Sequence, residues 1–114
     1  KAQAVRLEKV WLSSDKKSLL GSVAVSNLAI QKSVVCRFTF DYWKTTSEIA
    51  AEYSHVIRPH ETSLGHDRFT FSIRLSNTAN LESKTLFFCI RYSVNGQDYW
   101  DNNASRNFQV DFRK

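Results

Sequence analysis

The chain has 114 residues, of which 42% are hydrophobic and 24% are charged, a composition typical of one soluble globular domain. Its net charge of +5 comes from 16 basic and 11 acidic residues, and the basic residues are scattered along the chain. A nucleic-acid-binding surface needs clustered cations, and a membrane helix needs about 18 consecutive apolar residues. Neither pattern is present in the sequence, so we expect neither nucleic acid nor a membrane as a partner.

Apolar residues alternate with polar ones along most of the chain, which is typical of β-strands with one buried face. In chain order, the alternation predicts strands around residues 5–12, 21–25, 34–43, 69–75, 86–94 and 108–112. A change of phase at Lys9 predicts a β-bulge in the first of these strands. Segment 48–53 fits either a short strand or one helical turn, and 55–66 is expected to be the longest loop.

Turn signals separate these segments. The most specific is Asn95-Gly96, because these residues readily adopt the positive φ angles of a type I′ hairpin turn. Seven or eight short strands at this spacing predict an all-β fold, an antiparallel β-sandwich of immunoglobulin-like type. We interpret residues 1–114 as one module excised from a larger protein.

The two cysteines are predicted to be free thiols. Cys36 is in phase with the apolar Phe38, whereas Cys89 is out of phase with the apolar Phe88. Sulfurs on opposite faces of their strands cannot form a disulfide. Two free thiols are typical of a reducing compartment.

Residues for catalysis are hard to find. His55, His60 and His66 lack the spacing of metal ligands, and no nucleotide-binding or nucleophile motif occurs. Asp41 and Asp101 lie near aromatic residues, but turns and strand ends account for them without a glycosidase carboxylate pair. The sequence therefore predicts no enzyme, no metal site and no cofactor.

Aromatic residues on polar faces indicate a binding function. Trp43 lies on the polar side of its predicted strand, and Trp100 adjoins Tyr99, so one of these two neighbours must face away from the core. An indole ring can cover the apolar face of a sugar, while nearby amides and carboxylates bind its hydroxyls. Alternatively, the rings merely cap the ends of the sandwich. The candidate sugar-binding residues from this pattern are Trp43, Trp100, Asp101, Asn102 and Asn103.

Several motifs in order resemble those of family 21 carbohydrate-binding modules, which are starch- and glycogen-binding β-sandwiches. They are VRLE at 5–8, GSVAVSNLA at 21–29, RFTFDYWK at 37–44, DRFTF at 67–71 and NGQDYWDNN at 95–103. The sequence is most similar to the branch found in glycogen-targeting regulatory subunits of protein phosphatase 1. The resemblance runs from about Val5 to Val110.

This resemblance implies a role for particular residues. Trp43 and Trp100 would be stacking platforms, with Asn102, Asn103 and Asn107 binding glucose hydroxyls. Lys44 follows the first tryptophan as in the phosphatase branch. Asn27 and Lys32 fall at a second sugar site of starch-binding members, but Ile30 stands where those members carry an aromatic residue.

The resemblance further implies a non-catalytic, cytoplasmic, glycogen-associated module that targets protein phosphatase 1 to glycogen. Segment 100–110 resembles a stretch that contacts phosphatase substrates such as glycogen synthase. The phosphatase-docking motif is absent here, so the catalytic subunit would bind outside this chain.

Two alternatives remain open. One is a starch-binding appendage of a secreted amylolytic enzyme, in which Asn103-Ala104-Ser105 would be a glycosylation acceptor. The other is a protein-interaction sandwich that binds no sugar.

Overall fold

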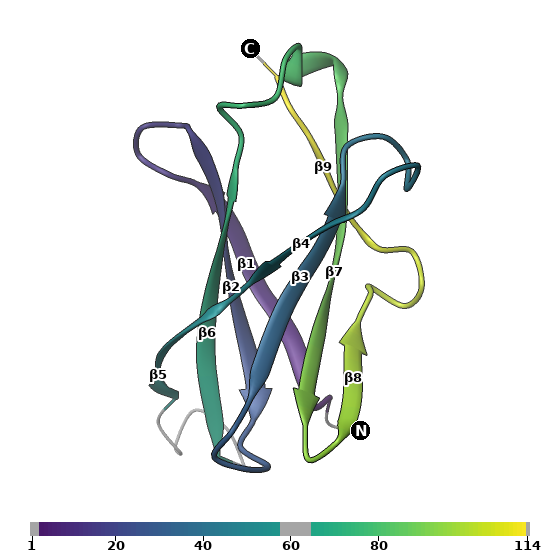
Figure 1. Ribbon diagram of the computed structural model, residues 1–114. Helices are drawn as coiled ribbons and strands as arrows, with labels where there is room; N and C mark the ends of the chain where they lie inside the picture. Colours follow the sequence, from purple (N-terminus) through teal and green to yellow (C-terminus); the bar gives the residue numbers. More distant parts are fainter. Residues whose placement is uncertain (1–2, 58–64, 114) are drawn as a thin grey trace.

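The computed structural model, which describes residues 3–57 and 65–113, contains two antiparallel β-sheets packed face to face (Figure 1). The four-stranded sheet contains, in spatial order, β1 (Val5–Leu12), β2 (Ser18–Ser26), β6 (His66–Arg74) and β5 (Glu52–Ile57). The five-stranded sheet contains β4 (Ser47–Ala50), β3 (Ser33–Thr39), β7 (Thr85–Val94), β8 (Gln97–Asp101) and β9 (Phe108–Asp111). Strands β8 and β9 pair with successive halves of β7, and a short 3₁₀ turn, η2 (Leu81–Ser83), precedes β7. The predicted antiparallel β-sandwich is confirmed.

The core consists of the inward-facing residues of both sheets, because successive side chains of a strand point to opposite faces. Val23 and Val25 of β2 and Phe88 of β7 are fully buried there. Gly21 of β2 faces the Phe71 ring so closely that an added Cβ would lie 2.1 Å from it. A side chain at position 21 would therefore displace a core ring.

The chain crosses between the two sheets at three connections, β2 to β3, β4 to β5 and β6 to β7, and the shortest of these is β4 to β5. Only Ala51 separates β4 in one sheet from β5 in the other, and its N–H donates to the Val34 carbonyl at 2.8 Å. The hydroxyl of Tyr92 on β7 donates to the carbonyl of Ser26 on β2 at 2.6 Å. Burial raises the pKa of Tyr92, so this phenol stays protonated as a donor.

Several local predictions can be compared with the structure. The β-bulge is confirmed between Leu7 and Lys9, and Asn95 and Gly96 have φ angles of 53° and 72°, as a type I′ turn requires. The ambiguous segment 48–53 lies in strands β4 and β5 and not in a helical turn. The described part of the chain contains nine strands, more than predicted.

The predicted histidine loop was too long, because β5 continues to Ile57 and β6 already begins at His66. Pairing between these two strands gives the end residues backbone partners. Residues 58–64, which include His60, lie outside the described residues. Within residues 3–57 and 65–113, no helix is long and apolar enough to cross a membrane.

The cysteines lie on opposite faces of the five-stranded sheet, as predicted. Cys36 belongs to the core, whereas Cys89 pairs with Arg37 in the register and faces outward. Both are free thiols, and burial raises the pKa of each. Cys89 is nonetheless only 7% exposed, so residues on the outer face must cover it.

Candidate functional site

The outer face of the five-stranded sheet carries an exposed tryptophan among charged side chains. Register places Glu48, Arg37, Arg91 and Trp100 on the same face of the adjacent strands β4, β3, β7 and β8. Trp100 is 40% exposed, while its neighbour Tyr99 packs against the core. This arrangement confirms that one of the two adjacent aromatics leaves the core. We call the surface formed by these four outward residues the Trp100 face.

The Trp100 ring is held in place by cations. The guanidinium carbons of Arg37 and Arg91 lie 5.2 and 5.6 Å from the ring centroid, within cation–π range. The Glu48 carboxylate accepts hydrogen bonds from Arg37 at 2.8 Å and from Arg91 at 3.2 and 3.3 Å. These bonds, with that from Arg37 the strongest, lower the pKa of Glu48. One carboxylate therefore fixes both arginines, and the arginines fix the ring.

Trp43 does not lie on a strand, and the prediction of a strand over 34–43 was wrong at its end. Strand β3 stops at Thr39, whose hydroxyl donates to the Asp41 carboxylate at 2.7 Å. The same oxygen accepts the N–H groups of Asp41 and Trp43 at 3.2 and 3.1 Å. These local bonds satisfy the backbone in a turn and compete with continuation of the strand.

The resulting loop, residues 40–46, folds over the outer face of the sheet, and we call it the Trp43 loop. Tyr42 and Trp43 adopt left-handed backbone angles, with φ of 57° and 67°, and the Tyr42 ring lies 5.4 Å from the ring of outward-facing Phe87. Hydrogen bonds from Thr39 and Thr45 lower the pKa of Asp41 to about 2, which keeps this turn-forming carboxylate charged. Trp43 is half-buried, and Lys44 beside it is exposed.

A second loop, residues 102–107, connects β8 to β9 and carries the predicted asparagines, so we call it the asparagine loop. Four of its residues have left-handed φ angles, namely Asn103, Ala104, Ser105 and Asn107. Asn102 accepts the Asn107 N–H through its backbone carbonyl at 2.7 Å and the Ser105 N–H through its side chain at 3.0 Å. The Asn103 amide donates to the Asn107 carbonyl at 3.0 Å. Hydrogen bonds of Asn102 and Asn103 therefore set the geometry of this loop.

These bonds leave different amides available to a ligand. Asn103 uses its side-chain nitrogen inside the loop, and Asn102 uses its side-chain oxygen. The side chain of Asn107 makes no hydrogen bond to any residue in the described part of the chain. Asn107 and the nitrogen of Asn102 are therefore the amide groups that can bind a hydroxyl without breaking the loop.

Asp101 lies beneath this loop and is only 6% exposed. Its carboxylate accepts the N–H of Leu7, on β1 of the other sheet, at 2.7 Å and that of Asn103 at 3.3 Å. The carboxylate predicted to bind sugar is thus engaged with backbone donors. Its position links the sheets and sets the start of the asparagine loop.

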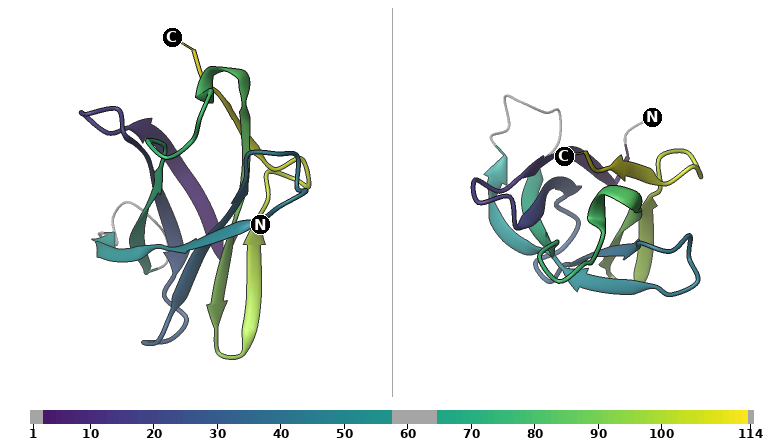
Figure 2. Two further views of the ribbon diagram at one scale, coloured as in Figure 1. Left: turned by 45° about the horizontal axis from the view of Figure 1, so that its top comes forward. Right: turned by 90° about the horizontal axis from the view of Figure 1, so that it is seen from above.

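The two loops project on the same side of the molecule, to the right in Figure 1 and in both views of Figure 2. Both adjoin the five-stranded sheet, since the Trp43 loop follows β3 and the asparagine loop follows β8. The structure therefore brings most of the predicted residues to one side of one sheet. These residues are Trp43, Lys44, Trp100, Asn102, Asn103 and Asn107.

Asn27 and Lys32 lie at a different place. Lys32 forms an ion pair with Asp67 at 2.9 Å, and both side chains are nearly buried. Asn27 is exposed and lines, with Lys32, a hollow of about 410 Å³ that also contains Tyr53. Tyr53 is 55% exposed with its ring against Phe69. Sequence reasoning missed this tyrosine because its segment shows no clear strand alternation.

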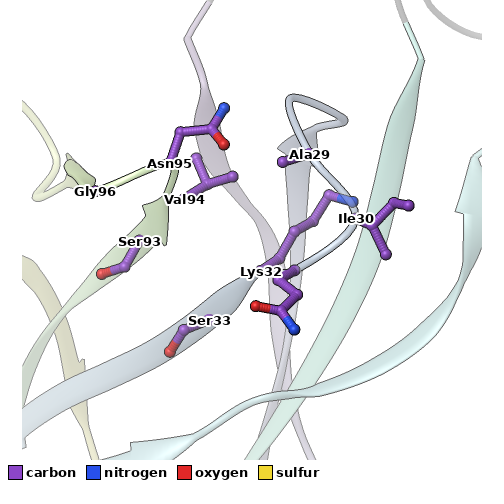
Figure 3. A pocket seen from close by; sticks show the side chains of 9 residues that line it. Ala29, Ile30, Lys32, Ser33, Ser93, Val94, Asn95 and Gly96 are labelled. Carbon is purple, nitrogen blue, oxygen red and sulfur yellow. The ribbon is translucent and has the colours of Figure 1, made fainter.

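A depression of about 750 Å³ lies between residues 29–33 and the turn at 93–96 (Figure 3). Figure 3 shows Lys32 and Ile30 on one side and Ser93, Val94 and Asn95 on the other. Among the described residues, no aromatic ring lines it, so it offers no stacking surface for a sugar. We therefore place the candidate site at the Trp100 face and not in this depression.

Comparison with known proteins decides the family. The model of the carbohydrate/starch-binding module (family 21) matches residues 1–111. The chain belongs to this family. Among curated proteins, protein phosphatase 1 regulatory subunit 3B of Homo sapiens is 37% identical over 95 residues, covering 82% of this chain and 32% of that protein. Subunit 3C of Rattus norvegicus is 35% identical over 98 residues, covering 86% of this chain and 30% of that protein. The chain thus spans about a third of the length of these relatives.

Solved structures give the same family. The carbohydrate-binding module of the muscle glycogen-targeting subunit of protein phosphatase 1 has a TM-score of 0.72 and 30% identity, covering 94% of this chain and 74% of that one. The starch-binding domain of Rhizopus oryzae glucoamylase, solved with β-cyclodextrin and maltoheptaose, has a TM-score of 0.68 and 27% identity, with 97% and 95% covered. These relatives are regulatory subunits and carbohydrate-binding modules, in agreement with the prediction of a non-catalytic module.

Proposed function

We propose that residues 1–114 form one α-glucan-binding module of a larger protein, and that the module binds glycogen at the Trp100 face. The observation that carries this proposal is the exposed Trp100 ring, which Arg37 and Arg91 hold on a flat sheet surface. A fixed ring loses little conformational entropy when a sugar stacks on it. Trp43 supplies a second ring from the neighbouring loop.

Hydroxyl recognition is assigned to the asparagine loop. Asn107 and the side-chain nitrogen of Asn102 offer the donors and acceptor that adjacent sugar hydroxyls need, and Lys44 adds a cation beside Trp43. We assign Asn103 and Asp101 a positioning role, because their side chains bind backbone groups that shape the loop.

A second, weaker sugar contact is proposed at the hollow near Asn27. Tyr53 supplies an exposed ring there, which compensates for the missing aromatic at Ile30. Asn27 would bind a hydroxyl, while Lys32, fixed by Asp67, shapes the wall. Several weak contacts suit a polymeric ligand, because binding at one site raises the effective concentration at the next.

The parent protein is proposed to target protein phosphatase 1 to glycogen in the cytoplasm. The named relatives are regulatory subunits of this phosphatase, and the rest of their length leaves room for a catalytic-subunit contact outside this chain. Glycogen synthase, contacted through segment 100–110, is the proposed substrate partner. Nucleic acid and membranes are not favoured, because carboxylates pair with four of the cations, with Glu48 shared between two of them; the four are Lys32, Arg37, Arg68 and Arg91.

The secreted starch-binding alternative receives less support from the asparagine loop. Glycosylation would have to modify the side-chain nitrogen of Asn103, which donates to the Asn107 carbonyl inside the loop. A sugar attached there would replace one of the two hydrogens of this nitrogen and place a bulky group beside the bond that sets the loop geometry.

Titration calorimetry with β-cyclodextrin and sedimentation with glycogen test the proposal. We expect saturable binding, no release of reducing sugar, and loss of most binding heat in Trp100→Ala. Leu12→Ala, which removes a 46%-exposed apolar side chain on β1, is the matched control and should bind normally. If the module binds no α-glucan, the proposal is wrong and the protein-interaction alternative replaces it.

A further inference from the structure

The third tryptophan lies on the opposite side of the sandwich from Trp100. Trp11 pairs with Leu20 on the outer face of the four-stranded sheet and is 38% exposed. Beside it is a hollow of about 430 Å³, lined by residues of β1, β2, β5 and β6. This volume falls within the range of small-ligand sites, roughly 300–1,000 Å³.

Two β-bulges shape the hollow. The pairing of β1 with β2 skips Glu8, and the pairing of β5 with β6 skips Ser54. Both extra residues line the hollow, one from each edge of the sheet. Bulges redirect side chains and are frequent beside functional sites, so the coincidence of two bulges at one hollow is a designed feature of the sheet.

The floor of the hollow is a rigid polar network. Glu8 accepts hydrogen bonds from Ser22 at 2.7 Å and from Arg68 at 2.7 and 2.9 Å. The Arg68 bonds contribute most to lowering the pKa of Glu8. Arg68 also lies 2.8 Å from Nε2 of His55, which must accept because a guanidinium can only donate. The network joins all four strands of the sheet.

Other polar groups around the hollow remain available. The Lys9 ammonium lies 4.9 Å from the Trp11 ring centroid and forms no ion pair with a carboxylate among residues 3–57 and 65–113. The Thr70 hydroxyl lines the hollow and makes no hydrogen bond to the described residues. An aromatic ring with an unpaired ammonium and an unpaired hydroxyl beside it matches a ligand with an apolar face and several hydroxyls.

We infer that this hollow, the Trp11 pocket, is a further α-glucan subsite that binds a glucose unit against Trp11, with Lys9 and Thr70 binding its hydroxyls. The inference rests on the proposed glucan-binding function. The lining already contains the carboxylate of Glu8, which pairs with Arg68 and would repel an anionic ligand, whereas a neutral sugar is not repelled. Because the Trp11 pocket and the Trp100 face lie on opposite outer faces, they bind different segments of a glucan.

The indole N–H signals of the three tryptophans, followed by NMR during titration with maltoheptaose, test each site separately. We expect the Trp11 signal to shift saturably in the unaltered chain and in Trp100→Ala. Lys9→Met and Thr70→Val keep the shape of the sheet surface. We expect either change to weaken binding at Trp11 by several-fold, up to about tenfold for the loss of an ionic hydrogen bond, and to leave Trp100 unaffected. Leu12→Ala should change neither signal.

The other outcomes are equally informative. If Trp100 shifts and Trp11 does not, the inference is overturned, the glucan-binding proposal stands and the Trp11 pocket is left to a protein partner. If the Trp11 shift disappears in Trp100→Ala, it reports an indirect change, and the subsite is again overturned. An equal response to cellohexaose would overturn the α-glucan assignment. If no tryptophan responds to maltoheptaose, both the inference and the proposed function fail.

Discussion

Both outer faces of the sandwich carry a tryptophan beside cations and a carboxylate, but they combine these groups differently. On the five-stranded sheet, the arginines that lie over Trp100 are themselves fixed by Glu48. On the four-stranded sheet, the cation over Trp11 is Lys9, whereas the carboxylate of Glu8 fixes Arg68 below it. The cations over the first ring are thus held by a carboxylate, whereas the cation over the second has no carboxylate partner among the described residues.

The difference predicts unequal affinities for the same ligand. Trp100 presents a ring whose neighbours are already ordered, so a sugar that stacks there pays little additional entropy. At Trp11, the Lys9 side chain must be ordered when it binds a hydroxyl, at a cost of about 1 kcal/mol. We therefore expect the Trp100 face to be the stronger site, and the following experiments test this contrast.

The largest effect is expected from Asp101→Ala, because Asp101 links the two regions through Leu7 of β1. Its removal leaves the partly buried N–H of Leu7 without this partner and should lower the free energy of unfolding by about 2 kcal/mol. Urea denaturation measures this change. The matched control is Asp98→Ala on the same strand, whose exposed carboxylate binds Ser93; it should stay within about 0.5 kcal/mol of the parent. A similar loss in both variants would contradict the proposed cross-sheet role.

Next in size is the loss of a stacking ring. Trp100→Ala should lower glucan affinity by about 1–3 kcal/mol with little change in Tm, because the ring lies on the surface. Trp43→Ala should weaken binding similarly but lower Tm more, since Trp43 is half-buried. Calorimetry and thermal melts on the same variants separate these effects. Unchanged affinity in a well-folded Trp100→Ala would refute the assignment of the Trp100 face.

A smaller effect is expected from Asn107→Ala. The amide makes no hydrogen bond to the described residues, so its removal should lower stability only through the poorer fit of alanine to the left-handed backbone at this position. Affinity should fall by about 0.5–1.5 kcal/mol, the net value of a typical hydrogen bond. Asn103→Ala is the comparison: its backbone is also left-handed, but it should lower Tm more, because the Asn103 amide additionally donates a hydrogen bond inside the loop. Equal Tm values for both variants would argue against this division of roles.

Glu48→Gln tests whether fixed arginines matter for the Trp100 ring. Losing the carboxylate charge weakens the attachment of Arg37 and Arg91, and we expect roughly a twofold to threefold loss of affinity because exposed ion pairs are weak. NMR titration should show this change at Trp100 and none at Trp11. A loss of equal size at both rings would show that the substitution acts through the whole fold.

The smallest effect is expected from changes of pH above 5, where ionisation of the carboxylates should leave the stability of the fold unchanged. Glu8 and Glu48 have pKa values below their ordinary 4.5, and the pKa of Asp41 is lowered from 3.8 to about 2. A lowered pKa means that the folded state prefers the charged form, so this stability is complete above about pH 5 and is lost as the pH falls toward 2. Thermal melts from pH 7 to pH 2 should follow that course. In Asp41→Asn, the fall below pH 4 should be less steep.

Local pattern alone determined the fold class, the face of most strand residues and the outward position of one of the neighbours Tyr99 and Trp100, because side-chain direction in a strand alternates with a period of two. The bulge at Lys9 and the opposite faces of the cysteines follow from the same alternation, and the turn at Asn95-Gly96 follows from the two residue types. Only the tertiary structure showed that Asp101 is engaged by Leu7, 94 residues away, and that Glu48 fixes arginines from two other strands. It likewise placed Trp43 in a turn and assembled the Trp11 pocket from four strands. Such features depend on which strands pair and in what register, and pairing between distant segments is decided by the packing of the whole sandwich.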